Sequence, residues 1–232
     1  MNNKIGLIFS HLHVRPDELY KFDILEYCIK HFKKFDNDFY IVVCGHGHTL
    51  PRAIIDIIDS HYWEVNIDSN EIGVGHPKFC IEGYKILKKN NINKSVKLRA
   101  SDIILNQDLF KSILNYTKLT LSEQTSIQRG MIGDLLMFGE TEDLLDLWTE
   151  LPWDYSKSGL FNLFDATNSL AKGQKQNYLS FLNENFHFVS PKEIMWVDVS
   201  HNWDSAQKCL AGEFSEGHLW GFHENHSHYG GF

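Results

Sequence analysis

The feature that most constrains the fold is an alternation of short apolar runs with longer helix-like segments over residues 4–98. The runs that indicate buried strands are 4–10, 39–44, 62–66 and 95–98. The segments between them that indicate helices are 16–32, 50–59 and 77–89. Strands that alternate with helices form a largely parallel sheet with the helices packed against it. The sequence therefore predicts an α/β fold with a mostly parallel, Rossmann-like central sheet flanked by helices.

The first predicted helix has the clearest periodicity, and we expect Pro16 to open it. Its apolar positions, which recur every three or four residues, are Leu19, Phe22, Leu25, Ile29 and Phe32. We expect 45–48 and 73–78 to be loops. The second half is less regular, with helices expected at 106–117, 141–151 and in parts of 159–187, an extended segment at 126–140 and a late strand within 194–200. No repeat or linker divides the chain, so we expect one domain over 1–232, with halves 1–105 and 106–232.

Composition excludes some classes of function. The formal net charge of −8 argues against a general nucleic-acid binder, which needs a basic surface. No apolar run approaches the roughly 20 residues that span a bilayer. The N-terminal segment lacks the layout of a signal peptide. The four cysteines are widely separated, which favours reduced thiols and a cytoplasmic protein.

Polar residues gather where the predicted strands end, which is where parallel sheets bind ligands. The residues at these ends are Ser10 and His11, then 45–48, then Asn66 and Asp68, then 99–102. The last of these ends is the richest, with Lys97, Arg99, Ser101 and Asp102 in six residues.

These residue types suit a diphosphate and its metal ion. A carboxylate such as Asp102 can hold Mg²⁺ or Mn²⁺ against phosphate oxygens. Arginine offers a fork of donors to phosphate, and lysine offers a point charge. The alternative is an Arg99–Asp102 ion pair that only closes a loop. Neither a GxGxxG motif nor a P-loop is present.

The block 75–105 resembles a segment of the GT-A-type glycosyltransferases, especially the WavE type of lipopolysaccharide-synthesis enzymes. The matching positions are Gly83, Lys97, Arg99, Ser101 and Asp102, the last in a shortened form of the DxD metal motif whose first aspartate is replaced by Ala100. The later segment 130–148 also resembles these enzymes. The resemblance covers about 1–150 and implies transfer of a sugar from a nucleotide-diphosphate sugar to a glycan or other hydroxyl acceptor.

The resemblance also implies roles for single residues. Asp102 would ligate Mn²⁺ or Mg²⁺, and Lys97, Arg99 and Ser101 would contact the donor or brace its loop. Ser10 and His11 would lie near the nucleoside, and Asp68 would accept a ribose or base hydrogen bond. The half 1–105 would bind the nucleotide sugar and 106–232 the acceptor. A C-terminal histidine would complete the metal site, the candidates being His201, His223, His226 and His228.

An inverting transfer also needs a carboxylate that takes the acceptor proton. Asp134 is the first candidate, because an unpaired carboxylate in its apolar segment would be costly. Pairing with Arg129 would explain Asp134 equally well. Glu140 is the second candidate, whereas Glu142 and Asp143 are expected in the first turn of a helix.

Two other classes of function stay open. The clusters at 10–13 and 45–49 would suit a histidine-centred, metal-dependent phosphoesterase that relies on His46 and His48. A non-catalytic carbohydrate-binding domain would use aromatic residues such as Trp148, Trp153 and Trp196, which equally fill cores. For the transferase we expect a cytoplasmic protein with a nucleotide-sugar donor and a glycan acceptor as partners. We expect no nucleic-acid partner and no transmembrane segment, whereas peripheral contact with a membrane is compatible with the sequence.

Overall fold

The computed structural model describes residues 4–35, 38–65, 72–122, 136–149, 167–168, 171–189, 193 and 196–198. Its strands are β1 (Ile5–Val14), β2 (Phe39–Gly47), β3 (Ser60–Val65), β4 (Lys94–Arg99), β5 (Asp102–Ile104), β6 (Leu119–Ser122), β7 (Met137–Glu140), β8 (Phe186–Val189) and β9 (Trp196–Asp198). Its main helices are α1 (Tyr20–Phe32), α2 (Arg52–Ile55), α3 (Ile72–Lys89), α4 (Gln107–Ile113), α5 (Thr141–Thr149) and α7 (Tyr178–Asn185).

Within these residues the main sheet has the strand order β3-β2-β1-β4-β7-β6-β8. The β1–β2, β1–β4, β2–β3 and β6–β8 pairs are parallel, whereas β7 is antiparallel to both of its neighbours. A second, two-stranded sheet pairs β5 with β9, so that Asp102 lies opposite Asp198 in the register. The predicted mostly parallel sheet is therefore confirmed.

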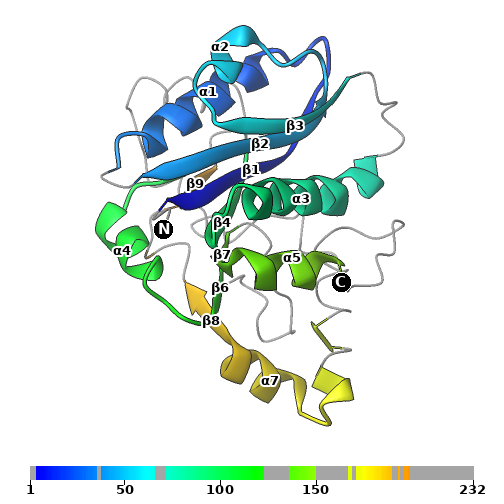
Figure 1. The fold of residues 1–232 in the computed structure, drawn as a ribbon, viewed down its shortest axis with the longest axis vertical. Coiled ribbons are helices and arrows are strands. Elements are labelled where there is room, and N and C mark those ends of the chain that lie inside the picture. Colours follow the sequence, from blue (N-terminus) through cyan, green and yellow to red (C-terminus); the bar gives the residue numbers. More distant parts are fainter. Residues whose placement is uncertain are drawn as a thin grey trace, which may run out of the picture.

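Helices cover both faces of the sheet (Figure 1). On one face, Leu7 and Phe9 of β1 pack with apolar residues of α1, α2 and α4. On the other face, Ile8 of β1 packs with apolar residues of α3 and α5, including Tyr84 and Trp148. Alternate residues of a strand point to opposite faces, so the continuous apolar runs of the sequence fill two cores at once.

The start of the first helix differs from the prediction. Pro16 lies in a turn, and α1 begins only at Tyr20, because the amide of Glu18 donates to the carbonyl of Arg15 and that of Lys21 donates to the carbonyl of Glu18. Leu19 is 45% exposed, so it does not belong to the buried face. The other four predicted positions of that face are buried.

Two predicted loops are in fact regular structure. Residues 45–47 continue β2, because β1 also runs on past Ser10 and pairs with them through Leu12, His13 and Val14. Residues 73–78 lie inside α3, with Pro77 inside the helix. The strand β2 can pair here because it has glycines: a Cβ at Gly45 would lie 2.3 Å from the carbonyl oxygen of Leu12, and Gly47 has a φ of +113°.

Several boundaries are shorter than expected. The helix predicted over 50–59 is the four-residue α2, and the helix predicted over 106–117 is α4. The short strands β5, β6 and β8 were not predicted separately. Glu142 and Asp143 do lie in the first turn of α5, as expected. Cys28, Cys44 and Cys80 are buried, reduced thiols. Among the described residues, no helix combines the length and the hydropathy that a membrane span requires.

Candidate functional site

A pocket of about 230 Å³ lies at the carboxyl ends of the neighbouring strands β1 and β4. It is lined by Leu12, His13, Lys21, Ile24, Arg99, Ala100 and Ser101. It forms here because β1 continues to Val14, whereas the chain leaves β4 after Arg99, turns at 100–101 and enters the separate β5–β9 sheet. The pocket therefore lies where parallel sheets bind ligands.

Arg99 and Asp102 form an ion pair at this turn. The carboxylate of Asp102 accepts from the Arg99 backbone N–H at 3.3 Å, from Nε at 3.4 Å and from Nη2 at 3.5 Å. The Asp102 side chain is completely buried, whereas a quarter of the Arg99 side chain is exposed. Burial makes this pair less screened than a surface ion pair. Both oxygens of Asp102 thus face Arg99, and Arg99 is one of the residues that line the pocket.

The side chains described around Asp102 do not fit a divalent cation. Mg²⁺ and Mn²⁺ need several oxygen ligands, and no group of three or more His, Cys, Asp or Glu side chains that could hold a metal occurs among the described residues. The buried carboxylate of Asp102 is turned to Arg99 instead. The side chain of Asp198, opposite Asp102, and all four C-terminal candidate histidines lie outside the described residues.

Lys97 and Ser10 are buried and do not line the pocket. Lys97 is fully buried, with Nζ 5.7 Å from the centre of the Trp148 ring, in a cation–π contact on the α3 and α5 side of the sheet. Ser10 is also fully buried, pairs with Arg99 in the strand register and accepts a hydrogen bond from Cys80 Sγ at 3.6 Å. Of the predicted donor contacts in the described part, only Arg99 and Ser101 line the pocket. His11 lies in β1, and its side chain is outside the described part.

Two residues that line the pocket, Lys21 and Ile24, were not predicted from the sequence. Lys21 donates from Nζ to the carbonyl of His13 at 3.1 Å and pairs with Glu18 at 2.8 Å. It lies in the first turn of α1, and with Ile24 it makes an i, i+3 pair that faces the strand end. That spacing was the available signal, but it becomes meaningful only once the extension of β1 is known.

The histidines of the two clusters form a stack. The rings of His13 and His46 are 4.4 Å apart and 4° from parallel, and Phe79 stacks on the other side of His46 at 5.2 Å. His46 is only 1% exposed, and its two ring nitrogens have no hydrogen-bond partner among the described residues. Burial and the neighbouring His13 lower the pKa of His46 to about 4, and burial also lowers the pKa of His13. Both rings are therefore neutral at pH 7.

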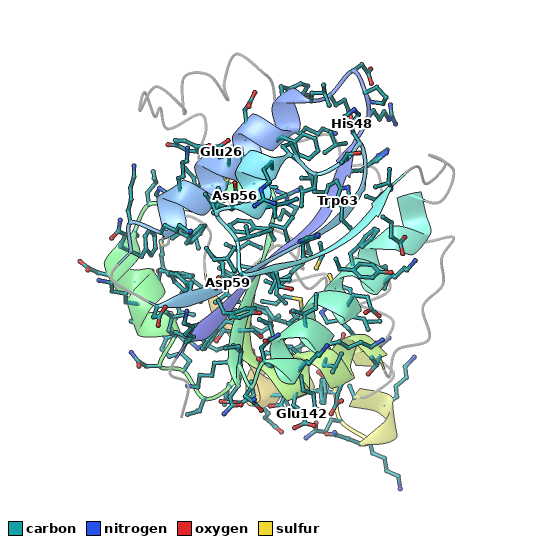
Figure 2. The ribbon with its side chains drawn as sticks, turned by 45° about the horizontal axis from the view of Figure 1, so that its top comes forward. Glu26, His48, Asp56, Asp59, Trp63 and Glu142 are labelled. Atoms are coloured by element: carbon teal, nitrogen blue, oxygen red, sulfur yellow. The ribbon has the colours of Figure 1, made fainter. Side chains whose placement is uncertain are left out.

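This geometry disfavours the phosphoesterase interpretation. Ring nitrogens bind a metal through lone pairs in the ring plane at about 2.0–2.1 Å, and two parallel stacked rings cannot aim those lone pairs at one ion. His48 lies beyond the end of β2 beside Trp63, whose Nε1 donates to the His48 carbonyl at 2.9 Å (Figure 2).

Glu140 is not brought to the pocket. It pairs with Lys94 at the start of β4, five residues before Arg99, and five strand residues span about 16 Å. Because β7 is antiparallel to β4, the last residue of β7 lies beside the first residue of β4, at the end of the strands opposite the pocket. Glu140 is therefore no longer a candidate base for chemistry at this pocket. Asp68 and Asp134 lie outside the described residues.

No known protein-family model matches this sequence, and no curated protein matches it. Two solved structures align over most of their length. One is assigned as a glucose-1-phosphate thymidylyltransferase from Bacillus anthracis, with a TM-score of 0.52 at 11% identity over 90% of this chain and 95% of that one. The other is a CMP:2-keto-3-deoxy-manno-octonic acid synthetase in complex with CTP, with a TM-score of 0.52 at 9% identity over 91% and 99%.

A glycosyltransferase also appears among the similar structures. It is GlyE of Streptococcus pneumoniae TIGR4, with a TM-score of 0.43 at 12% identity over 95% of this chain and 57% of that one. Structural similarity at identities this low shows a shared fold and nothing about function. The chain thus shares the fold of the thymidylyltransferase and of the synthetase, a mostly parallel α/β sheet flanked by helices.

Proposed function

We propose that this protein is a glycosyltransferase that uses a nucleotide-diphosphate sugar. The observation that carries the proposal is the pocket at the ends of β1 and β4, whose lining includes the cationic residues Arg99 and Lys21 and the hydroxyl-bearing Ser101. These groups suit a diphosphate, because guanidinium and ammonium groups offset its negative charge. The resemblance of 75–105 to GT-A-type glycosyltransferases, including the WavE type, points to the same donor class.

Nucleotidyl transfer is the competing reaction on this fold, and the sequence after β1 disfavours it. Triphosphates are commonly cradled by the backbone of a glycine-rich loop. Here no glycine occurs between Gly6 and Gly45, and the residues that follow Ser10 continue as a paired strand. The segment therefore lacks the backbone freedom for such a cradle, whereas side-chain cations at the pocket remain suited to a diphosphate.

In the proposed reaction an acceptor hydroxyl oxygen forms a bond to the anomeric carbon of the sugar. The bond from that carbon to the diphosphate oxygen breaks, and its electron pair leaves with the nucleoside diphosphate. Arg99 and Lys21 stabilise the negative charge that develops on this leaving group. The hydroxyl proton passes to a base, for which Asp134 stays the predicted residue if the reaction inverts configuration. A cell-surface glycan remains the predicted acceptor.

Ligand-induced stabilisation tests the donor class. A ligand that binds only the folded state raises the free energy of unfolding, by about 2.7 kcal/mol at a hundred times its Kd. UDP, GDP, CDP and ADP should be compared by thermal unfolding, and the matching nucleotide sugars then tested for release of nucleoside diphosphate. We expect one base to stabilise the chain. Pyrophosphate release from a nucleoside triphosphate and a sugar phosphate would support nucleotidyl transfer instead.

A further inference from the structure

The turn after β4 carries its own cation. Where the resemblance expects two aspartates around a metal ion, this chain has Ala100 in place of the first, and the second, Asp102, is paired with Arg99. Asp198 lies opposite Asp102 in the backbone register of the β5–β9 pair. The cation that the described structure places beside Asp102 is the guanidinium of Arg99.

The geometry of the pair fits a guanidinium that is oriented for binding. Three Arg99 donors contact Asp102, the backbone N–H, Nε and Nη2. Because Asp102 is completely buried, it can fix one side of the guanidinium without itself reaching the pocket. Arg99 lies on the pocket wall with Ser101 and Lys21. A planar guanidinium that is held in this way loses little further entropy when it binds phosphate.

We propose that Arg99, oriented by Asp102, binds the diphosphate of the donor directly and takes the place of the divalent cation that the resemblance implies. This inference rests on the proposed function and names how that site recognises its substrate. Arg99 is then the binding residue, and Asp102 is a positioning residue that acts through it. Lys21, on the other wall of the pocket, adds a second positive charge.

The test is the affinity for nucleoside diphosphate with and without metal. Calorimetric titrations with UDP, GDP, CDP and ADP should be run in EDTA and in Mn²⁺ on the native chain. We expect the tightest nucleotide to bind within about two-fold of the same Kd in both buffers. Charged hydrogen bonds contribute about 1.5–3 kcal/mol, so Arg99→Gln should weaken binding roughly ten- to hundred-fold. Arg99→Lys should recover only part of this, because it lacks the fork.

The role of Asp102 needs a measurement that a merely structural effect would not change. We expect Asp102→Asn to weaken binding of the diphosphate in both buffers while it changes the affinity for the matching nucleoside much less. Arg52→Gln is the matched control for the loss of an Arg–Asp ion pair. It removes an exposed Arg–Asp pair of α2, whose Nε–Oδ1 distance is 2.7 Å, away from the residues that line the pocket. Thermal unfolding of each variant confirms that it is folded.

Two results would overturn the inference, and they differ. If binding appears only in Mn²⁺, is abolished by EDTA and is lost in both Asp102→Asn and Asp198→Asn, the two aspartates hold a metal and the proposed function survives. If no nucleoside diphosphate binds in either buffer, the proposed function fails together with the inference.

Discussion

The carboxyl ends of β2 and β4 lie at the same end of the sheet, and both carry polar residues. These residues differ in their exposure to solvent. At the end of β2, His46 is buried between His13 and Phe79 and is neutral. At the end of β4, Arg99 remains a quarter exposed and lines a pocket. The two ends differ in strand pairing. The strand β2 stays paired with β1 and β3 through Gly47, whereas β4 ends at Arg99 and the chain turns away.

Of Arg99 and His46, the one that lines the pocket is the one at which its own strand stops pairing. Continued pairing surrounds a side chain with neighbours on its own face, and a neutral imidazole tolerates that burial. Where a strand ends, the neighbouring strand and helix form walls around an opening. Lys97 lies two residues before the end of β4, and its side chain is buried, as that of His46 is.

The largest expected effect separates the interior of β4 from its end. Trp148 is completely buried over Lys97, so Trp148→Ala should lower the free energy of unfolding by about 3–5 kcal/mol. Urea unfolding measures it. Trp63→Ala is the control and should cost less, because Trp63 is only partly buried. If Trp148→Ala folds, its affinity for nucleoside diphosphate should stay within a few-fold of native. A loss as large as that of Arg99→Gln would contradict the separation.

The next effect removes the pairing that buries His46. In Gly45→Ala the new Cβ would lie 2.3 Å from the Leu12 carbonyl oxygen and 2.7 Å from the Trp63 ring, so the backbone must shift. We expect a loss of about 2–3 kcal/mol, in the upper part of the overpacking range, by urea unfolding. Gly173→Ala is the control, since nothing lies within 4 Å of its Cβ position, and it should be neutral or stabilising. Equal effects of the two substitutions would refute the steric argument.

The pH dependence of stability tests the neutral state of His46. Its pKa of about 4 in the folded protein lies below the ordinary value near 6.5, so the unfolded chain takes up the proton more readily. Stability from His46 is therefore complete above pH 6.5 and is lost as the pH falls towards 4. In His46→Phe the loss between pH 7 and pH 4 should be smaller than in the native chain by about 2–3 kcal/mol. Denaturant unfolding at both pH values measures this, and parallel pH profiles would show that His46 is not the group concerned.

The smallest effect concerns the second pocket cation. Partly exposed charges contribute about 0.2–1 kcal/mol, so Lys21→Met should weaken binding of nucleoside diphosphate about two- to five-fold by calorimetric titration. Lys30→Met on the same helix is the control, because Lys30 pairs with Glu26 and does not line the pocket. A loss in Lys21→Met as large as that in Arg99→Gln would make Lys21 the principal phosphate contact.

Much of the fold could be predicted because the strands of the first half are continuous apolar runs and α1 has a clear helical period. The pocket was predicted in part. Arg99 and Ser101 were identified from their place after a strand, but Lys97 and Ser10 were assigned to the donor although both are buried. His13 was predicted only as part of a metal-binding histidine cluster, because polar residues that continue a strand look in sequence like the loop that ends it. Lys21 and Ile24 were missed, because they face the pocket only once the extension of β1 is known.

By itself the sequence determined the α/β fold class, the parallel first half and the end of the sheet at which the pocket lies, because periodicity and apolar runs are local properties. Only the tertiary structure decided where pairing stops, since that depends on glycines of β2 that admit the backbone of β1. It also decided that Asp102 faces Arg99, because burial and ion pairing depend on neighbours brought together by the fold. The charges at this site are encoded in the sequence, but their orientation comes from packing.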